Sequence, residues 1–272
     1  LPVEYMREIG FNICRLKTRS AISVGAVTSE VSPEDALRTA LRLGESVLIM
    51  GEVRSKEALV LYEAMRVGAI GNVVMGTIHG ETAYSVWDRV VNDLGVPNTS
   101  FKATDMCVTC APIRFKGALK RDRRLIEVTE IGKRWYEDPA KEGGLLDLVS
   151  YDASTDHHTI LKHNIFENSE FFKKTKMRRG LDIDTIWEDI RYRGKAKQLL
   201  VDLKNKHNIP ELLEGKYTVR ANDKFLLMQE KSRQELGSVD YEKAFQEWKK
   251  WLEEGFVKEL LARRKAREGT KT

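Results

Sequence analysis

The pattern of apolar and polar positions in the first 95 residues predicts alternating strands and helices. Two short apolar runs, Val47–Met50 and Val73–Ile78, indicate neighbouring strands of a parallel sheet, buried on both faces. Phe11–Thr18 alternates between apolar and polar residues, which predicts a further strand. Helical patterns lie between and after the two apolar runs. This alternation is typical of a parallel α/β sheet.

Capping residues mark where the helices begin. Ser32 followed by Pro33, Glu34 and Asp35 predicts a helix start, because it combines a capping hydroxyl, a first-turn proline and two acids at the positive end of the helix dipole. Ser55 is expected to cap the next helix. The apolar stripes of the three expected helices are Ala36, Leu37, Ala40 and Leu41; Ala58, Leu59, Tyr62 and Met65; and Val86, Val90 and Leu94. Gly44 and Gly68 are expected to end the first two.

The pattern changes after residue 112. Residues 113–131 form shorter alternating segments between charged turns, which predicts an antiparallel ribbon. Proline and glycine around residues 138–144 indicate a break. Beyond residue 151 the chain becomes charged and helical, most clearly over 183–206 and 241–267. We therefore predict an α/β domain over residues 1–137 and a mostly helical C-terminal region over 138–272.

Composition and charge exclude few classes of protein or of binding partner. Hydrophobic residues make up 42% of the 272 residues, enough for a buried core, and no apolar run approaches the ~20 residues of a membrane span. The net charge is +5. Basic residues cluster over 112–134 and 258–272, which we interpret mainly as solvated surface. A nucleic-acid site is the less favoured alternative, and attraction of the tail to an anionic membrane stays open.

The cysteines and histidines give little support for a metal site. Cys107 and Cys110 are three residues apart in an apolar segment that predicts a strand, where they would point to opposite faces. The only other cysteine is Cys14, so no second pair completes a zinc site. His157, His158 and His163 are interpreted as surface residues. We therefore predict no metal site built from protein ligands alone.

Two polar residues stand where ligands bind in open α/β sheets. Glu52 follows the strand predicted at 47–50, and His79 follows the strand predicted at 73–78. Ligands bind beyond the carboxyl ends of parallel strands. Each residue alone has an ordinary structural interpretation, as a solvated loop acid or a satisfied histidine. Their joint position predicts an active site at one sheet edge.

The motifs around these residues resemble the type II/IV secretion ATPases, which include pilus-assembly and archaeal flagellum motors. The family's Walker B strand ends in Gly-Glu followed by Val/Ile-Arg, as in Gly51-Glu52-Val53-Arg54. Its His box is similar to Gly76-Thr77-Ile78-His79. Residues 16–19 and 34–42 add to the resemblance, which extends to about residue 130.

The resemblance implies a partial RecA-like P-loop ATPase core with a C-terminal, mostly helical extension, working as a homohexamer with ATP and Mg²⁺. It implies that Glu52 activates the attacking water and that His79 contacts the γ-phosphate. Arg19, Arg54 and Thr77 are the expected nucleotide-binding residues. Arg19 is the first choice for an arginine that reaches a neighbouring subunit, ahead of Arg38 and Arg42, and an ordinary ion pair is the alternative for each arginine.

The implied partners are a polytopic inner-membrane platform protein and, indirectly, pilin-like or secreted substrates. The expected location is the cytoplasm, in peripheral association with the cell membrane. No specific nucleic acid is expected.

The sequence departs from the family at one essential motif. Gly-x-x-x-x-Gly-Lys-Ser/Thr, the loop that cradles the phosphates, occurs nowhere in the 272 residues. We therefore expect the chain to be the C-terminal part of a longer motor ATPase and to be inactive by itself. Two alternatives remain open: a scaffold subunit that lacks a P-loop, and a nucleic-acid translocase or binding module.

Overall fold

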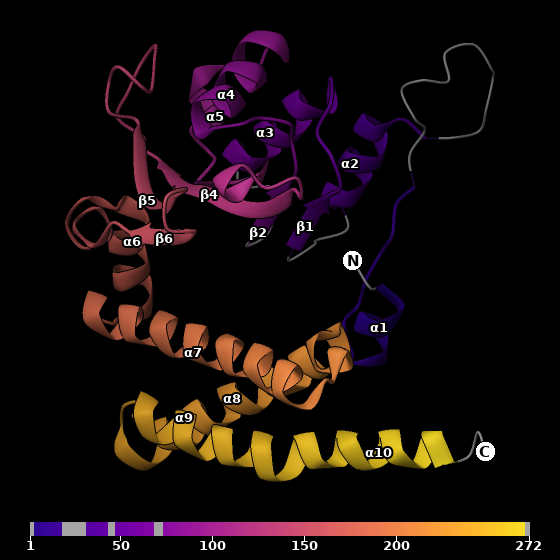
Figure 1. The fold of residues 1–272 in the computed structure, drawn as a ribbon. Coiled ribbons are helices and arrows are strands. Elements are labelled where there is room, and N and C mark those ends of the chain that lie inside the picture. Colours follow the sequence, from indigo (N-terminus) through magenta and orange to yellow (C-terminus); the bar gives the residue numbers. More distant parts are fainter. Residues whose placement is uncertain (1–2, 18–30, 43–46, 68–72, 270–272) are drawn as a thin grey trace. The chain divides into compact units, whose positions relative to one another are not determined.

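The computed structural model describes residues 3–17, 31–42, 47–67 and 73–269 (Figure 1). The chain divides into two compact units. One comprises residues 16–179, and the other combines residues 1–15 with residues 180–272. The first unit is mixed α/β and the second is helical, so the structure confirms a mixed α/β protein with a helical C-terminal region.

The α/β unit begins with the elements that the apolar pattern predicts. They are α2 (Pro33–Arg42), β1 (Val47–Met50), α3 (Glu57–Val67) and β2 (Val73–Gly76). The two strands pair in parallel, with Val47 opposite Val73 and Met50 opposite Gly76. As predicted, Ser32 caps α2, because its hydroxyl accepts a hydrogen bond from the Asp35 amide at 3.1 Å. Gly44 and Gly68, the expected helix ends, lie outside the described residues.

The two-stranded sheet buries only one of its faces. Leu48, Met50 and Val74 pack against the core of the unit. The opposite face carries four apolar residues that are 37–55% exposed, namely Val47, Ile49, Val73 and Met75. The prediction of strands buried on both faces is therefore wrong for the part of the chain that is described.

One further local prediction is wrong, and another is right only in part. Residues 11–17, which follow α1 (Val3–Glu8), form no strand. Instead, the Phe11 amide donates a hydrogen bond to the Met6 carbonyl at 3.0 Å, at the end of α1. The Arg7 guanidinium binds the Ile13 carbonyl at 2.6 Å. A segment with an alternating pattern forms a strand only where a neighbouring strand satisfies its backbone hydrogen bonds. In α3 the buried face is formed by Ala58, Leu61, Tyr62 and Ala64, whereas Leu59, expected in the stripe, is 41% exposed.

A helix and an antiparallel sheet complete the α/β unit. The helix is α4 (Ala83–Asp88), continued by a π-helical turn, η1 (Arg89–Asp93). The sheet has the order β3-β4-β5-β6. The remaining elements of the unit are α5 (Asn98–Phe101), β3 (Met106–Ile113), η2 (Phe115–Gly117), β4 (Asp122–Ile131), β5 (Leu145–Asp152), β6 (His157–Ile160), η3 (Asn164–Asn168) and α6 (Glu170–Arg179).

The antiparallel ribbon predicted over residues 113–131 is confirmed in part: β4 lies within this range, but its partner strand β3 lies almost entirely before it. The strands β5 and β6 were not predicted. The two cysteines of β3 differ in environment, because Cys107 is buried and Cys110 is exposed. Because β5 pairs with β4, the sheet continues across the predicted break near residue 138. The domain boundary after residue 137 stays a prediction.

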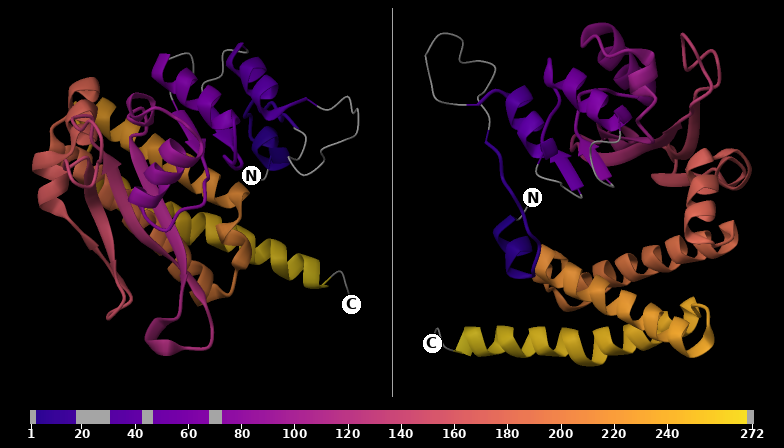
Figure 2. Two further views of the ribbon diagram at one scale, coloured as in Figure 1. Left: turned by 90° about the horizontal axis from the view of Figure 1, so that it is seen from above. Right: turned by 180° about the vertical axis from the view of Figure 1, so that it is seen from behind.

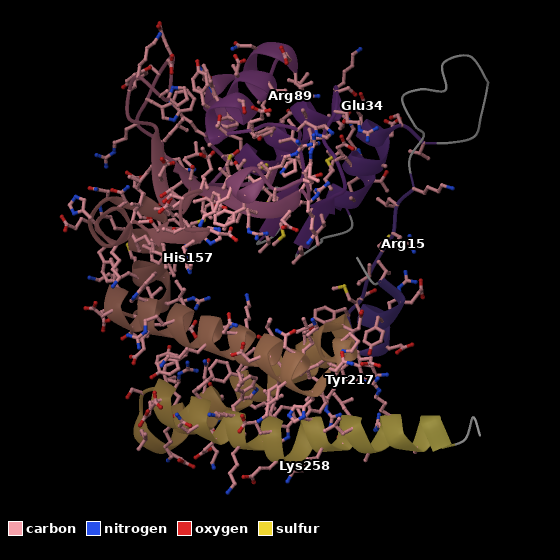
Figure 3. All side chains as sticks on the ribbon, in the orientation of Figure 1. Arg15, Glu34, Arg89, His157, Tyr217 and Lys258 are labelled. Atoms are coloured by element: carbon pink, nitrogen blue, oxygen red, sulfur yellow. The ribbon has the colours of Figure 1, made fainter. Side chains whose placement is uncertain are left out.

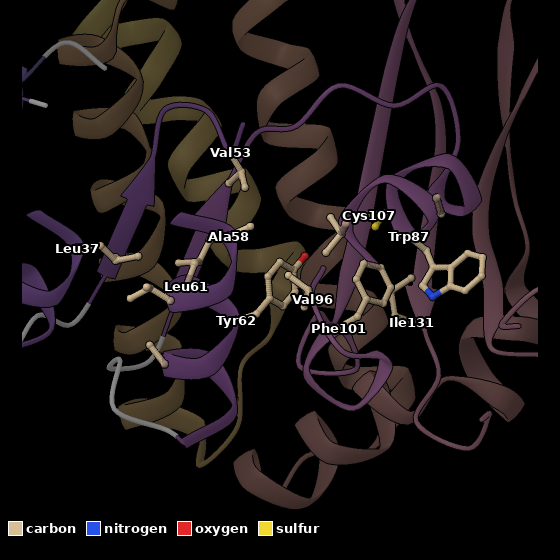
Figure 4. Close-up of a cluster of buried hydrophobic side chains, with 14 of the residues drawn as sticks. Leu37, Val53, Ala58, Leu61, Tyr62, Trp87, Val96, Phe101, Cys107 and Ile131 are labelled. Carbon is tan, nitrogen blue, oxygen red and sulfur yellow. The ribbon is translucent and has the colours of Figure 1, made fainter. Parts of the chain in front are cut away.

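One aromatic core joins the two sheets of this unit (Figure 4). Tyr62 of α3 stacks on Phe101 at a centroid distance of 5.9 Å. Trp87 of α4 meets Trp135 edge-on at 6.2 Å, and Trp135 is fully buried. Burial of these large side chains against Ile131 of β4 fixes α3 and α4 relative to the antiparallel sheet.

The second unit is a helical bundle with its own core (Figure 2). Its elements are α1, α7 (Ile183–His207), η4 (Pro210–Leu213), α8 (Gly215–Leu236), α9 (Tyr241–Lys250), η5 (Trp251–Phe256) and α10 (Val257–Gly269). The helices predicted over 183–206 and 241–267 are confirmed. The latter is one continuous helix in which η5 is a π-helical stretch between α9 and α10. Trp248, Leu252, Phe256 and Leu260 of this helix are all buried.

Among the described residues, no helix is long and apolar enough to cross a membrane.

Candidate functional site

The structure brings Glu52 and His79 together at the carboxyl ends of β1 and β2. His79 Nε2 lies 3.2 Å from Glu52 Oε1. The Glu52 side chain is 26% exposed, and that of His79 is 81% exposed. Because the two strands are parallel and directly paired, their following residues emerge at the same sheet edge. The predicted juxtaposition of these two groups is therefore present.

The loops that carry the two residues are also bonded to each other. The Val53 amide donates to the Thr77 carbonyl at 2.8 Å. The Thr77 hydroxyl donates in the opposite direction, to the Gly51 carbonyl. Thr77, expected to contact nucleotide, is thus placed at the site, and in this conformation its hydroxyl holds the two loops together. The separation of Glu52 from His79 is fixed by backbone as well as side-chain contacts.

Arg54 stabilises the ionised form of Glu52. Its guanidinium donates to Glu52 Oε2, so the two carboxylate oxygens have different partners, Arg54 and His79. The hydrogen bond from Arg54 is the main cause of a lowered Glu52 pKa; it outweighs desolvation, which acts in the opposite direction. The charges of Arg54, His79 and Arg89 lower the pKa further. At neutral pH this carboxylate is an acceptor suited to orienting a water molecule.

Glu57 shapes the loop that presents Arg54. It is 4% exposed, at the start of α3. Its Oε1 accepts from the Arg54 amide at 2.6 Å and from the Ser55 amide at 2.9 Å. Its Oε2 accepts from the Ser55 hydroxyl at 2.7 Å. Ser55, expected to cap α3, instead donates its hydroxyl and its amide to Glu57. Sequence reasoning missed Glu57 because a first-turn acid usually signifies only a solvated helix start.

Arg89 is a second residue that sequence reasoning missed. It begins η1, directly after α4 (Figure 3). Its Nε is buried and has no hydrogen-bond partner among the described residues, yet its charge acts on Glu52. Glu127 of β4 holds the beginning of α4, because its Oε1 accepts from the Ala83 amide at 2.6 Å. Arg89 lies ten residues after His79, a spacing that no general rule marks as functional.

The remaining predicted residues are not brought to the site by the described structure. Arg19 lies outside the described residues. Arg38 and Arg42 are exposed on α2. Among the residues that the structure describes, no group of three or more histidine, cysteine, aspartate or glutamate side chains is arranged to hold a metal ion.

Comparison with known proteins tests the resemblance to the type II/IV secretion ATPases. Residues 3–115 match the family model of the type II/IV secretion system protein. This secretion-family region includes both strands, Glu52, Arg54 and His79, and it ends just after β3. The resemblance seen in the sequence is therefore confirmed over these residues.

Two archaeal proteins are similar to the secretion-family region. Both are uncharacterized proteins of Methanocaldococcus jannaschii. The first is 28% identical over 115 residues, which are 42% of this chain and 41% of that protein. The second is 31% identical over 108 residues, which are 39% of this chain and 19% of that protein. The chain thus spans well under half of the length of each of these relatives.

Proposed function

We propose that the chain is the C-terminal part of a RecA-like, hexameric motor ATPase that couples ATP hydrolysis to protein secretion or to assembly of a pilus- or flagellum-type filament. The observation that carries this proposal is the Glu52–His79 pair at the ends of two paired parallel strands. An ionised carboxylate and a histidine at that edge suit phosphoryl transfer, in which catalysis consists mainly of positioning and charge stabilisation.

The residues at the edge fit one side of a Mg-ATP group. ATP supplies the phosphoryl group that is transferred to water. Glu52 would accept a hydrogen bond from that water and orient it, since its lowered pKa keeps it ionised. His79, largely exposed, would donate to a phosphate oxygen. Arg54 binds the Glu52 carboxylate, and Arg89 adds positive charge that acts on Glu52. The chain provides no P-loop, so the cradle for the other phosphates has to come from outside these residues.

The exposed face of the β1–β2 sheet supports this proposal. Parallel strands occur almost only in sheets that are covered on both faces. Here four apolar side chains of one face are 37–55% exposed. A larger α/β core, with additional strands and helices, would cover them. The same additional segment would supply the missing P-loop, so one addition accounts for both observations.

The remaining parts of the proposal concern partners and location. We propose a homohexameric ring on the cytoplasmic side, peripherally associated with the cell membrane through a polytopic platform protein. Movements of the ring would act on that protein, and through it on pilin-like or secreted substrates. Arg19 would reach the neighbouring subunit's nucleotide.

The direct test replaces Glu52 by Gln in the protein that carries the P-loop. We expect turnover to fall by about 10²–10⁴-fold, with Mg-ATP binding retained. Glu63→Gln, an exposed acid on α3, serves as the matched control and should leave turnover unchanged. Normal turnover by Glu52→Gln would refute the role given to this carboxylate.

A second measurement tests whether a P-loop segment exists. The intact mass of the protein purified from its own organism should exceed 31.2 kDa, and the additional segment should contain the P-loop motif. In parallel, calorimetric titration of the 272-residue chain with Mg-ATP should show no tight binding. A native mass of 31.2 kDa would refute the motor proposal in favour of a scaffold subunit, and tight binding by the chain alone would show that its nucleotide site is complete.

A further inference from the structure

The connection between β3 and β4 is strongly basic. Residues 114–123 contain five basic residues and one acid, Asp122. We name this segment the basic loop. It connects β3 to β4 and includes the first two residues of β4, and η2 turns the chain with positive φ angles at Lys116 and Gly117 (Figure 2). The cations are therefore gathered at one end of the sheet.

Most of these cations have no acidic partner. Lys120 pairs with Asp122 at 2.8 Å. The other four, Arg114, Lys116, Arg121 and Arg123, are exposed and form no ion pair with a described acid. Next to the loop, Asp156 is already bound by both ends of the Arg124 guanidinium, at 2.8 and 2.9 Å. The acids near the loop are thus neutralised, and the four cations remain available to an external anion.

Strand geometry separates one of these cations from the internal ion pairs. β4 begins at Asp122, and the side chains of a strand alternate between its two faces, so Arg123 points to one face of the hairpin end. Asp122 and Arg124 point to the opposite face, where Arg124 is bound to Asp156. Arg123 therefore lies on the face opposite to the ion pairs of Asp122 and Arg124.

An apolar side chain lies among the cations. Leu119 is 95% exposed, more than any other large hydrophobic residue among those described. Ala118 beside it is also exposed. Phe115, at the other side of the turn, is half-buried, with the Lys116 ammonium 5.1 Å from its ring centre. A protruding leucine surrounded by basic side chains matches the interface of a bilayer, which has anionic headgroups outside and acyl chains beneath.

We propose that the basic loop binds directly to anionic lipid at a membrane surface, with Leu119 inserted between the headgroups. This goes beyond the proposed ATPase function, because it assigns a lipid contact to the chain itself and involves no nucleotide. Nucleic acid fits the loop less well. Phosphate contacts would use the cations but leave Leu119 exposed, and the half-buried Phe115 offers no free ring for base stacking.

The test is co-flotation of the 272-residue chain with vesicles of phosphatidylcholine, with or without phosphatidylglycerol, in the absence of nucleotide. We expect binding only to the vesicles that contain phosphatidylglycerol, and weaker binding at higher salt. The double variant Arg121→Glu, Arg123→Glu should reduce the partition coefficient by about 25-fold or more, since each basic residue near the surface contributes about fivefold. Leu119→Ser should reduce it by about fivefold, because the inserted side chain is lost.

The matched control makes the same change of charge elsewhere. Lys197→Glu, Lys206→Glu on α7 replaces two exposed lysines that form no ion pair with a described residue. It should retain binding, and thermal unfolding should show that all variants are folded. Equal loss in the loop variant and the control would overturn the proposal, since binding would then follow net charge alone. Binding to neutral vesicles, unchanged binding by Leu119→Ser, or displacement of the vesicles by DNA of equal charge would each overturn it too. Because no nucleotide is present, failure here leaves the ATPase proposal untouched.

Discussion

Removal of the Glu57 carboxylate should destabilise the α/β unit and loosen the loop that carries Arg54. Glu57 is buried at the start of α3, where its two oxygens accept three hydrogen bonds from Arg54 and Ser55. Two of the donors are backbone amides, which have no other partner in the loop. In Glu57→Ala all three bonds are lost. In Glu57→Gln the amide oxygen can still accept from both backbone amides.

The size of the effect follows from these contacts. Each hydrogen bond contributes about 1 kcal/mol net, and more where an acceptor is charged. Arg54 and Ser55 are exposed, so water can reach their amides after truncation, which keeps the cost at the lower end. Glu57→Ala should therefore lower the free energy of unfolding by about 3 kcal/mol, including the lost interaction with the helix dipole. Glu57→Gln should lower it by about 1 kcal/mol, because the charge and the bond accepted from the Ser55 hydroxyl are lost while the two amide bonds remain.

Calorimetry and amide hydrogen exchange measure the two consequences. For a unit of this size we expect the midpoint of unfolding to fall by about 6–12 °C in Glu57→Ala and about 2–4 °C in Glu57→Gln. The amides of residues 54 and 55 should exchange faster in Glu57→Ala. Glu63→Ala, an exposed acid of the same helix, should change the free energy of unfolding by no more than about 0.5 kcal/mol. If Glu57→Ala matched this control in both assays, the reasoning would be refuted.

The pH dependence gives an independent test. Burial raises the pKa of Glu57, but the hydrogen bonds from the Ser55 hydroxyl and from the amides of Arg54 and Ser55 outweigh it, so the pKa lies below the ordinary 4.5. The stabilisation by the carboxylate is therefore complete above the unfolded-state pKa and is lost as the pH falls through the lowered folded-state pKa. The difference in unfolding free energy between the wild type and Glu57→Gln should be constant at neutral pH and shrink below pH 4.5.

Two further predictions concern packing and reactivity. Gly144→Ala should lower the free energy of unfolding by about 2–3 kcal/mol, because the new methyl group would lie 2.3 Å from Cδ1 of the buried Trp135. Gly194→Ala, in open space within α7, should instead raise it by about 0.5–1 kcal/mol. Thermal unfolding measures both changes. Burial raises the pKa of the Cys107 thiol to about 11, so iodoacetamide at pH 8 should label Cys110 in the native protein and Cys107 only in denaturant, as mass spectrometry would show.

The sequence predicted those features of the fold that depend on local pattern. A capping serine and a first-turn proline were enough to locate α2, and two apolar runs were enough to locate β1 and β2. The strand predicted over 11–18 failed because pairing is not a local property. Strand β5 was missed although most of its residues are apolar, whereas the polar segment of β6 becomes a strand through pairing with β5.

The candidate site was predictable in part. Glu52 and His79 could be placed together because paired parallel strands end at one edge. Glu57 and Arg89 could not be found in this way. An acid in the first turn of a helix and an arginine within a helix are both common on protein surfaces. Only the buried hydrogen bonds of the first, and the buried, unpartnered Nε of the second, distinguish them.

The π-helical stretch inside the long C-terminal helix has a consequence for its apolar face. Trp248, Leu252, Phe256 and Leu260 follow one another at intervals of four residues, and all are buried. In an ideal α-helix each such step overshoots a full turn by about 40°, so Leu260 would lie about 120° around the helix from Trp248. The wider turn of η5 takes more residues per revolution and removes part of this rotation. A helical wheel drawn from the sequence alone would therefore divide one continuous face into two.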